Sequence, residues 1–405
     1  MKCKLELHEN QPRQVSVFHP APLPPPLAGR GRRIASAFFC AALAALLVAS
    51  AVAQTASPPV DARAVMAERP PELLAAYNFF RDAGAREANA GVTAYDLNTA
   101  LYSDGALKFR YLYLPPGAQA SYRDDGVFVF PVGAVLIKTF AFAADMRWLG
   151  QNLRFLETRL LVRRASGWEA RAYVWNEAQT EARLTNIGAS VPVRFIDEDG
   201  ASTALDWAVP NRNQCKGCHD LAGQLTPVGP TARNLNRSVS YPVAPPYMSE
   251  GMLVQAMWVN QLRTWRERGL IDQVPAYPPR MANAFDTSTG SLNDRARAYL
   301  DVNCANCHNP AGPAHTSGLD LRWSQRDPAR WGVFKPPVAA GRGSAGFAFS
   351  IEPGHPERSI LLHRMASTDP GVMMPELGRQ VVDARAVALM RAWIAGMDGE
   401  GRVRE

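Results

Sequence analysis

Hydrophobic and polar positions change their period near residue 209. Before it, they alternate over short runs bounded by Gly, Pro and Ser, which is typical of β-strands. The strands predicted are 107–114, two runs within 126–143, a hairpin over 153–176, then 191–197 and 203–209. Short strands at this spacing predict an antiparallel, sandwich-like all-β domain.

The hairpin over 153–176 carries the clearest alternation. Its turn is expected at residues 165–167, and the side chains expected to share one face are Leu156, Thr158, Leu160 and Val162. Glu157 and Arg159 fall between them. The base rate for charged residues favours a solvated strand face for this pair over a catalytic role.

After residue 209 the apolar positions recur at helical spacing. Ser249 is expected to cap a helix that runs to about residue 268, where Gly269 ends it. Ser291 and Asp294 form a capping box for a second helix, and Asp383 begins the last one. The pattern therefore predicts a multidomain chain, with the β-rich domain followed by mainly α-helical ones.

The N-terminal segment resembles an export signal. A basic cluster at 30–33 precedes an apolar run over 34–52, and Ala51-Val52-Ala53 matches a cleavage site. Residues 1–53 are therefore expected to be removed near Ala53/Gln54, with the mature protein in the periplasm. The alternative is an uncleaved membrane anchor, because the run is long enough to span a bilayer.

Charge adds little to this picture. The 405 residues include 44 Lys and Arg against 37 Asp and Glu. Much of the net positive charge lies in residues 1–53, and no basic cluster follows. We therefore expect no nucleic-acid partner, since such proteins present a clustered basic face.

Cysteine usage is the most informative feature. Cys3 and Cys40 lie in the expected signal segment, and the remaining four belong to "QCKGCHD" (214–220) and "NCANCHN" (303–309). The pattern C-x-x-C-H is typical of covalent c-type haem attachment, with the histidine as iron ligand. Two covalently bound haem c groups are therefore predicted, on these residues: Cys215, Cys218 and His219, and Cys304, Cys307 and His308.

Two other chemistries remain open. The four cysteines could hold one zinc ion, although this leaves two well-placed histidines unexplained. A C-x-x-C pair could also be a thioredoxin-type redox centre, but that requires a βαβ context which neither motif has.

Residues 291–405 resemble a class I cytochrome c domain, with a helix before C-x-x-C-H, a C-terminal helix and a methionine loop, "GVMMPELGR". The resemblance implies Met374 as the sixth iron ligand, with Met373 and Met365 as alternatives. A thioether ligand raises the haem potential.

The first motif matches that pattern less well. "TPVGPTARNL" (226–235) is similar to the Gly-Pro loop of class I cytochromes, which implies that the Pro230 carbonyl orients His219. Met281 stands at the expected distance for a sixth ligand. Met257, another ligand or an open position are the alternatives.

From "LKFRYLYLP" to "MPELGR" the chain resembles a family of bacterial diheme c-type cytochromes. Together with the patterns above, the resemblance divides the chain into an expected signal segment (1–53), a β-rich domain (54–209), a first haem region (210–290) and a class I cytochrome c-like domain (291–405). It implies a periplasmic electron carrier rather than an enzyme. Its partners would be a donor dehydrogenase or cytochrome and an acceptor oxidase or cytochrome. The alternatives are a diheme peroxidase-like enzyme with an open site at the first haem, or a haem subunit that docks a dehydrogenase.

Overall fold

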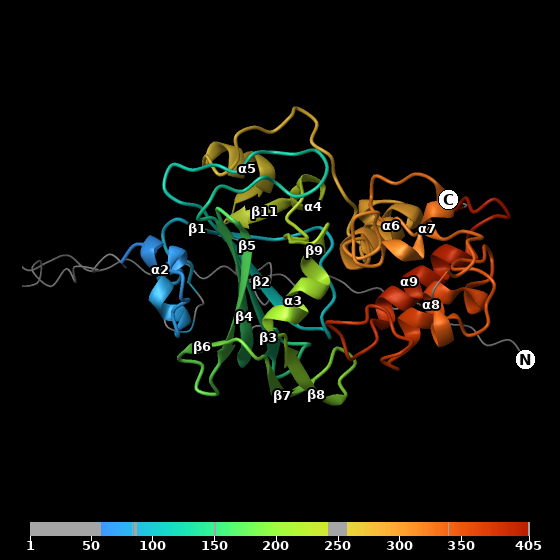
Figure 1. Cartoon of the computed structure of the whole chain (residues 1–405), viewed down its shortest axis with the longest axis horizontal. Helices are drawn as coiled ribbons and strands as arrows, with labels where there is room; N and C mark the ends of the chain where they lie inside the picture. The colour runs from blue at the N-terminus through green and yellow to red at the C-terminus, as the bar shows by residue number, and fades with distance from the viewer. Residues whose placement is uncertain are drawn as a thin grey trace, which may run out of the picture. The chain divides into compact units, whose positions relative to one another are not determined.

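The largest element of regular structure is a six-stranded antiparallel sheet (Figure 1). The structure, a computed structural model, describes residues 58–82, 84, 87–149, 151–241, 257–338 and 340–403. The strands follow chain order across the sheet: β1 (Val92–Tyr95), β2 (Leu107–Tyr113), β3 (Val135–Ala143), β4 (Leu153–Arg164), β5 (Gly167–Trp175) and β6 (Ala182–Thr185). The predicted signal segment and the start of the helix predicted at Ser249 lie outside the described residues.

Both faces of this sheet are buried. One packs against the segment that holds α2 (Ala62–Met66) and the 3-10 helix η1 (Leu74–Tyr77). The other is covered at one end by α4 (Ala232–Leu235) and α5 (Gln261–Glu267). At its other end lies the separate hairpin of β7 (Ala189–Ile196) and β8 (Ser202–Val209).

A β-bulge changes the face predicted for one residue of β4. Phe140 pairs with Glu157 and Ala141 pairs with Phe155, so Leu156 has no partner across the strands. Leu156 packs in the core beneath β7 and β8, whereas Leu160 and Val162 pack against α2 and η1. The prediction that these residues share one face is therefore wrong at Leu156, because one extra residue reverses the alternation.

The segment after β8 alternates short helices with short hairpins. Its elements are α3 (Arg212–His219), β9 (Asp220–Leu221), β10 (Gln224–Leu225), α4, β11 (Ser238–Tyr241), β12 (Met257–Asn260) and α5. Of the helix predicted to end near residue 268, only α5 is found in the described part. Residues 257–260 pair with β11 instead.

The C-terminal segment packs around α6 (Leu292–Asn303) and α9 (Ala384–Ala395). Trp393 is fully buried at this contact, and its indole N–H donates to Asn293 Oδ1 over 3.0 Å. Ser291 and Asp383 cap the two helices as predicted. The remaining elements are η3 (Thr287–Thr289), η4 (His315–Ser317), α7 (Pro328–Trp331), η5 (Gly341–Ser344), η6 (Pro356–Arg358) and α8 (Ile360–Ala366).

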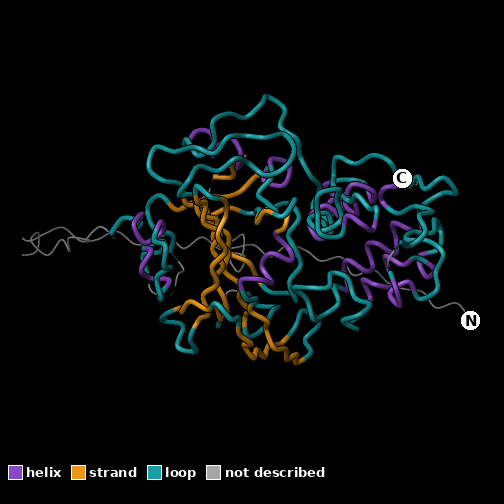
Figure 2. The backbone as a smooth tube through the Cα atoms, in the orientation of Figure 1, coloured by secondary structure: helices purple, strands orange, loops and turns teal. Residues whose placement is uncertain are grey.

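The expected fold class is wrong. The β-rich part is built on one six-stranded sheet rather than on a sandwich, and no large helical domain follows it among the residues that the structure describes. Helix makes up only about 24% of the structure, as short segments separated by loops (Figure 2). The longest helices described, α6 and α9, have 12 residues each. Residues 57–405 form one compact unit, so the boundaries expected at 209/210 and 290/291 fall inside it.

Candidate functional site

The first C-x-x-C-H motif lies on α3. The Asn211 side chain accepts a hydrogen bond from the N–H of Gln214, and the Gln214 side chain accepts one from the N–H of Asn211. This capping box pairs two N–H groups that a helix start leaves free. The resulting helix presents Cys215 and Cys218 on one side and ends at His219.

The ring of His219 has a defined tautomer. Its Nδ1 lies 2.9 Å from the carbonyl oxygen of Thr226, which can only accept. Nδ1 therefore carries the proton, and Nε2 keeps a free lone pair. Burial, and next the charge of Lys138, lower the pKa of His219 to about 4, so the ring is neutral at pH 7.

The loop resemblance implied that the carbonyl of Pro230 orients His219. In the structure, the carbonyl beside Nδ1 of His219 is that of Thr226. The short β9–β10 hairpin turns the chain back, and the N–H of Thr226 donates to the carbonyl of His219 over 2.6 Å. This second bond fixes Thr226 beside the ring. Pro230 lines the adjacent cavity instead.

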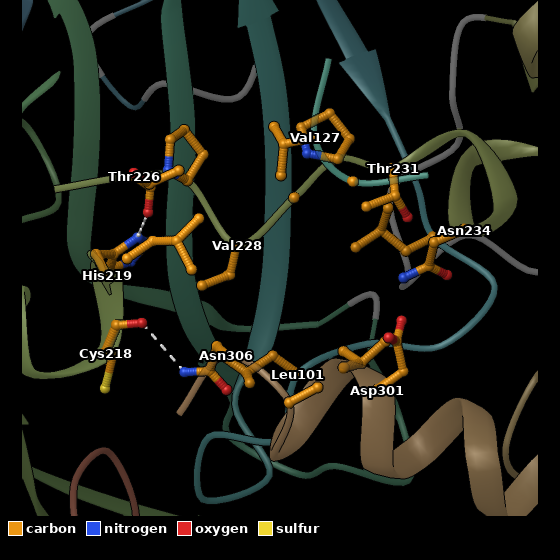
Figure 3. A pocket seen from close by; sticks show the side chains of 18 of the residues that line it. Leu101, Val127, Cys218, His219, Thr226, Val228, Thr231, Asn234, Asp301 and Asn306 are labelled. Atoms are coloured by element: carbon orange, nitrogen blue, oxygen red, sulfur yellow. Dashed lines mark hydrogen bonds between the residues drawn. The ribbon is translucent and has the colours of Figure 1, made fainter. Parts of the chain in front are cut away.

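A cavity of about 220 Å³ lies beside His219. Figure 3 shows His219, Val228 and Asn306 around it, with Asp301 on α6 at the opposite side. The sheet adds Arg110 and Lys138 to the lining.

Met281 does not line this cavity. Its side chain is only 1% exposed, and its N–H donates to the carbonyl of Arg233 over 2.8 Å. Spacing along the chain suggested Met281 as a ligand, but the fold places it in the interior. Met257, the alternative, lies in β12.

Positive charge gathers on the sheet under the first motif. Arg110, Lys138 and Arg159 lie directly opposite one another on β2, β3 and β4. Like charges in this arrangement repel. Glu157 relieves part of the repulsion by accepting two hydrogen bonds from Arg159, of 2.6 and 2.8 Å. The Glu157 side chain is completely buried, so the solvated strand face expected for it is wrong.

The second motif begins where α6 ends. Cys304 is the C-cap of that helix, and its N–H donates to the Leu300 carbonyl over 2.9 Å. His308 Nδ1 lies 3.0 Å from Ser317 Oγ, which gives its own proton to the carbonyl of Ala314 over 2.7 Å. Ser317 must therefore accept from His308, and Nε2 is again the free nitrogen.

His308 faces a second cavity, of about 340 Å³, which is also lined by Cys304, Met365 and Met374. Met373 is not among the lining residues. Burial, and next the charge of Arg364, lower the pKa of His308 to about 4. The fold therefore brings a neutral imidazole and the thioether of Met374 to one cavity.

The two motifs touch each other. The Asn306 side-chain amide donates to the carbonyl of Cys218 over 3.1 Å (Figure 3). Cys307 Sγ lies 3.9 Å from the carbonyl of Gly217. The two cavities therefore belong to neighbouring sites, although 89 residues separate the motifs along the chain.

The cysteines fit neither of the other chemistries. All four are free, and in the part of the chain that the structure describes no three His, Cys, Asp or Glu side chains gather to hold a metal. The single zinc site is therefore not formed. Burial raises the pKa of Cys304 to about 12 and that of Cys307 to about 11, whereas a thioredoxin-type pair needs a lowered value.

The same groups fit covalently attached haem. Each motif offers two free thiols and a neutral imidazole whose Nε2 is available, with a cavity alongside. The sequence indicated the thiols and histidines. It missed Thr226, Ser317 and Asn306, because these partners follow no fixed spacing from the motif.

No protein-family model matches this chain, and no curated protein or solved structure matches it. Over the described ranges, no helix is both long enough and apolar enough to cross a bilayer.

Proposed function

We propose that this protein is a diheme c-type cytochrome that carries electrons between redox partners in the periplasm. Haem, when bound, supplies one-electron chemistry at its iron. The residues that would attach it and provide the histidine ligands are Cys215, Cys218 and His219 at the first site, and Cys304, Cys307 and His308 at the second.

The contact between the two motifs is the observation that carries this proposal. Asn306 of the second motif is hydrogen-bonded to Cys218 of the first. Attachment at both motifs would place two redox centres beside each other in one compact unit. An electron accepted at one centre would then pass to the other without any large movement of the chain.

The residues around each histidine prepare it to bind iron. The hydrogen bonds from Nδ1 to Thr226 and Ser317 hold both rings in one tautomer and make Nε2 more basic. Met374 would complete the coordination beside His308, and its thioether would raise the potential of that centre.

The partners would be proteins on either side of an electron-transfer chain. A dehydrogenase or another cytochrome would donate, and an oxidase or another cytochrome would accept. The β-rich part offers a surface on which such a partner could dock. Periplasmic location rests on residues 1–53 alone.

Haem content tests the proposal directly. The mature protein is purified from cells that contain a c-type haem attachment system, and covalent haem is measured as the pyridine haemochrome. We expect two haems per chain, and one each in the double variants C215A/C218A and C304A/C307A. A wild-type protein without covalent haem would end the proposal.

A diheme peroxidase-like enzyme is the second candidate. It is favoured by one observation: among the described residues that line the cavity beside His219, none is a methionine. An open position there would give a high-spin first haem that binds CO, and peroxide turnover with a reduced cytochrome. Low-spin spectra at both haems, without CO binding, would support the carrier instead.

A further inference from the structure

Arg379 is a buried arginine that is only partly paired. It lies between Met374 and α9, is 5% exposed, and lines the cavity of His308. Its Nε donates to the carbonyl of Met374 over 3.0 Å, and Nη2 donates to the carbonyls of Arg364, Met365 and Ser367. Its Nη1 is buried and has no hydrogen-bond partner.

This arrangement leaves a positive charge without a close counter-ion. The ion pairs that the described residues form do not include Arg379; its nitrogens bond to backbone carbonyls. An unpaired N–H in the interior is destabilising, and more so in a charged group. Because Nη1 belongs to a cavity-lining side chain, a ligand in that cavity could supply the missing acceptor.

The other charged side chains that line the cavity already have ion-pair or hydrogen-bond partners. Arg364 Nη2 lies 3.6 Å from Glu376 Oε1. Asp383 accepts from Tyr299 Oη over 3.1 Å and from the N–H of Ala386. Among the described side chains that line this cavity, the guanidinium of Arg379 is therefore the one that keeps a buried N–H without an acceptor, and such a group suits a carboxylate.

We infer that Arg379 Nη1 binds a carboxylate of the ligand held in the cavity of His308. This inference rests on the proposed function, under which the carboxylate is a propionate of the second haem. Arg379 is then also a positioning residue. Its Nε holds the Met374 carbonyl, so one guanidinium links the propionate to the loop that presents the thioether.

Three variants of the full mature protein separate these roles. R379Q removes the positive charge and the guanidinium N–H groups that donate in several directions. R379K keeps the charge but cannot reach the propionate and the Met374 carbonyl together. R342Q is the matched control, because Arg342 is 68% exposed, pairs with Asp369, and is not among the residues lining either cavity.

We expect all variants to retain two covalent haems, because the cysteines are unchanged. In R379Q the weak far-red band of Met–iron ligation should weaken or vanish, and the midpoint potential of the second haem should fall. The propionate-bending band in the resonance Raman spectrum should shift, since it reports hydrogen bonding of that carboxylate. R379K should recover part of the potential, and R342Q should match wild type.

The outcomes are distinguishable. Wild-type protein without covalent haem would overturn the proposed function, whatever Arg379 does. Two haems together with an unchanged Raman band and potential in R379Q would overturn only the role of Arg379. If R379Q fails to accumulate, the same measurements on R379K decide, because its propionate band must still shift.

Discussion

In each motif, one hydrogen bond to Nδ1 of the histidine decides that Nε2 is the ring nitrogen left free to bind a metal. His219 donates to a backbone carbonyl, whereas His308 donates to Ser317, a side chain that can be replaced. The two sites therefore respond differently to mutation. At the second, the basicity of the ring depends on one hydroxyl group.

Replacement of Ser317 should raise the midpoint potential of the second haem. S317A removes the acceptor from His308 Nδ1, which makes Nε2 a weaker donor to the oxidised iron. We expect an upward shift on the order of 40 mV, equivalent to about 1 kcal/mol for one electron. Spectroelectrochemical titration measures it, with S344A as control because the Ser344 hydroxyl bonds within its own turn, to Gly341 and Gly346. A lower potential in S317A would contradict the assignment.

Met281 should behave as a core residue rather than as a ligand. M281A should lower the free energy of unfolding by about 2–5 kcal/mol, because a buried side chain is truncated. M281L should cost less than about 1.5 kcal/mol, since its volume is similar. Neither change should alter the optical spectrum. A high-spin signal in M281L, whose side chain cannot bind iron, would restore Met281 as the sixth ligand.

Sequence predicted best those residues whose chemistry is local. The capping box at Ser291 and the cap at Asp383 are defined by neighbours within a few positions, and both are confirmed. Glu157 and Arg379 were not predicted, because their roles depend on what covers them. Alternation places Glu157 on one side of β4, but does not reveal that the indole N–H of Trp207 on β8 donates to it over 3.1 Å.

At the scale of elements, the two motif-bearing helices differ in their support. The described structure gives α3 no buried residue, whereas α6 buries six of its twelve against α9 and neighbouring loops. A helix without a buried face opens readily, and a short one is marginal by itself. Attachment through Cys215 and Cys218 should therefore stabilise α3 far more than the second attachment stabilises α6.

Hydrogen exchange should reveal that difference. In C215A/C218A, amides of α3 should exchange at least about tenfold faster than in wild type, because no residue of this helix is fully buried and few tertiary contacts oppose its local opening. In the matched variant C304A/C307A, amides of α6 should remain protected by their packing on α9. Equal loss of protection in both helices would contradict this argument.

Arg164 of β4 and Arg171 of β5 both donate to the carbonyl of Ala67 in the N-terminal segment. Glu169 pairs with both arginines. Burial would raise the pKa of Glu169, but hydrogen bonds from Arg171 and Arg164 outweigh it and lower the pKa. Because the pKa of Glu169 is lower in the folded protein, its ionised carboxylate stabilises the fold at pH values above its unfolded pKa of about 4.5. This contribution is lost as the pH falls through the folded pKa.

E169Q should therefore lower the free energy of unfolding by about 3 kcal/mol at pH 7, since it leaves the fully buried Arg171 side chain without its carboxylate. Below about pH 4 the difference from wild type should shrink. Urea denaturation across this range measures it. E181Q is the control: Glu181 forms a partly exposed pair with Arg183 and should contribute less than about 1 kcal/mol. A difference that grows towards acid pH would reverse the assigned sign.

Elements were predicted well where neighbours in sequence are also neighbours in space. The β4–β5 hairpin, the strands β7 and β8 and the helices α6 and α9 are of this kind. The helix predicted up to residue 268 was not, because residues 257–260 pair with β11 across a long connection. Tertiary pairing overrides local periodicity there. The bulge at Leu156 is another feature that a periodic pattern does not reveal.

At the scale of the whole molecule, contacts join the parts that were expected to be separate domains. Arg233 pairs with Asp301 on α6 over 2.9 Å, and both side chains are under 9% exposed. Asp104 accepts from the N–H groups of Gln380 and Val381. The two C-x-x-C-H motifs predicted two sites, but their spacing did not reveal that contacts join the surroundings of both motifs in one compact unit.

The compact unit formed by residues 57–405 should unfold in a single cooperative transition. R233M removes the cation from the buried pair with Asp301 and should lower the free energy of unfolding by about 3 kcal/mol. In a cooperative unit, that loss must shift every probe equally. We therefore expect circular dichroism of the sheet and visible absorbance of the haems to give coincident denaturation curves, both moved to lower urea in R233M.

Independent domains would respond in another way. The haem absorbance would then change at one urea concentration and the sheet signal at another, and R233M would shift the two curves unequally. R402Q serves as the control, because Arg402 is 69% exposed and pairs only with nearby residues of the C-terminal turn. Separate transitions in wild type would return the chain to the multidomain organisation that its motifs suggested. A single transition would mean that any mutation weakening the sheet also weakens both haem sites.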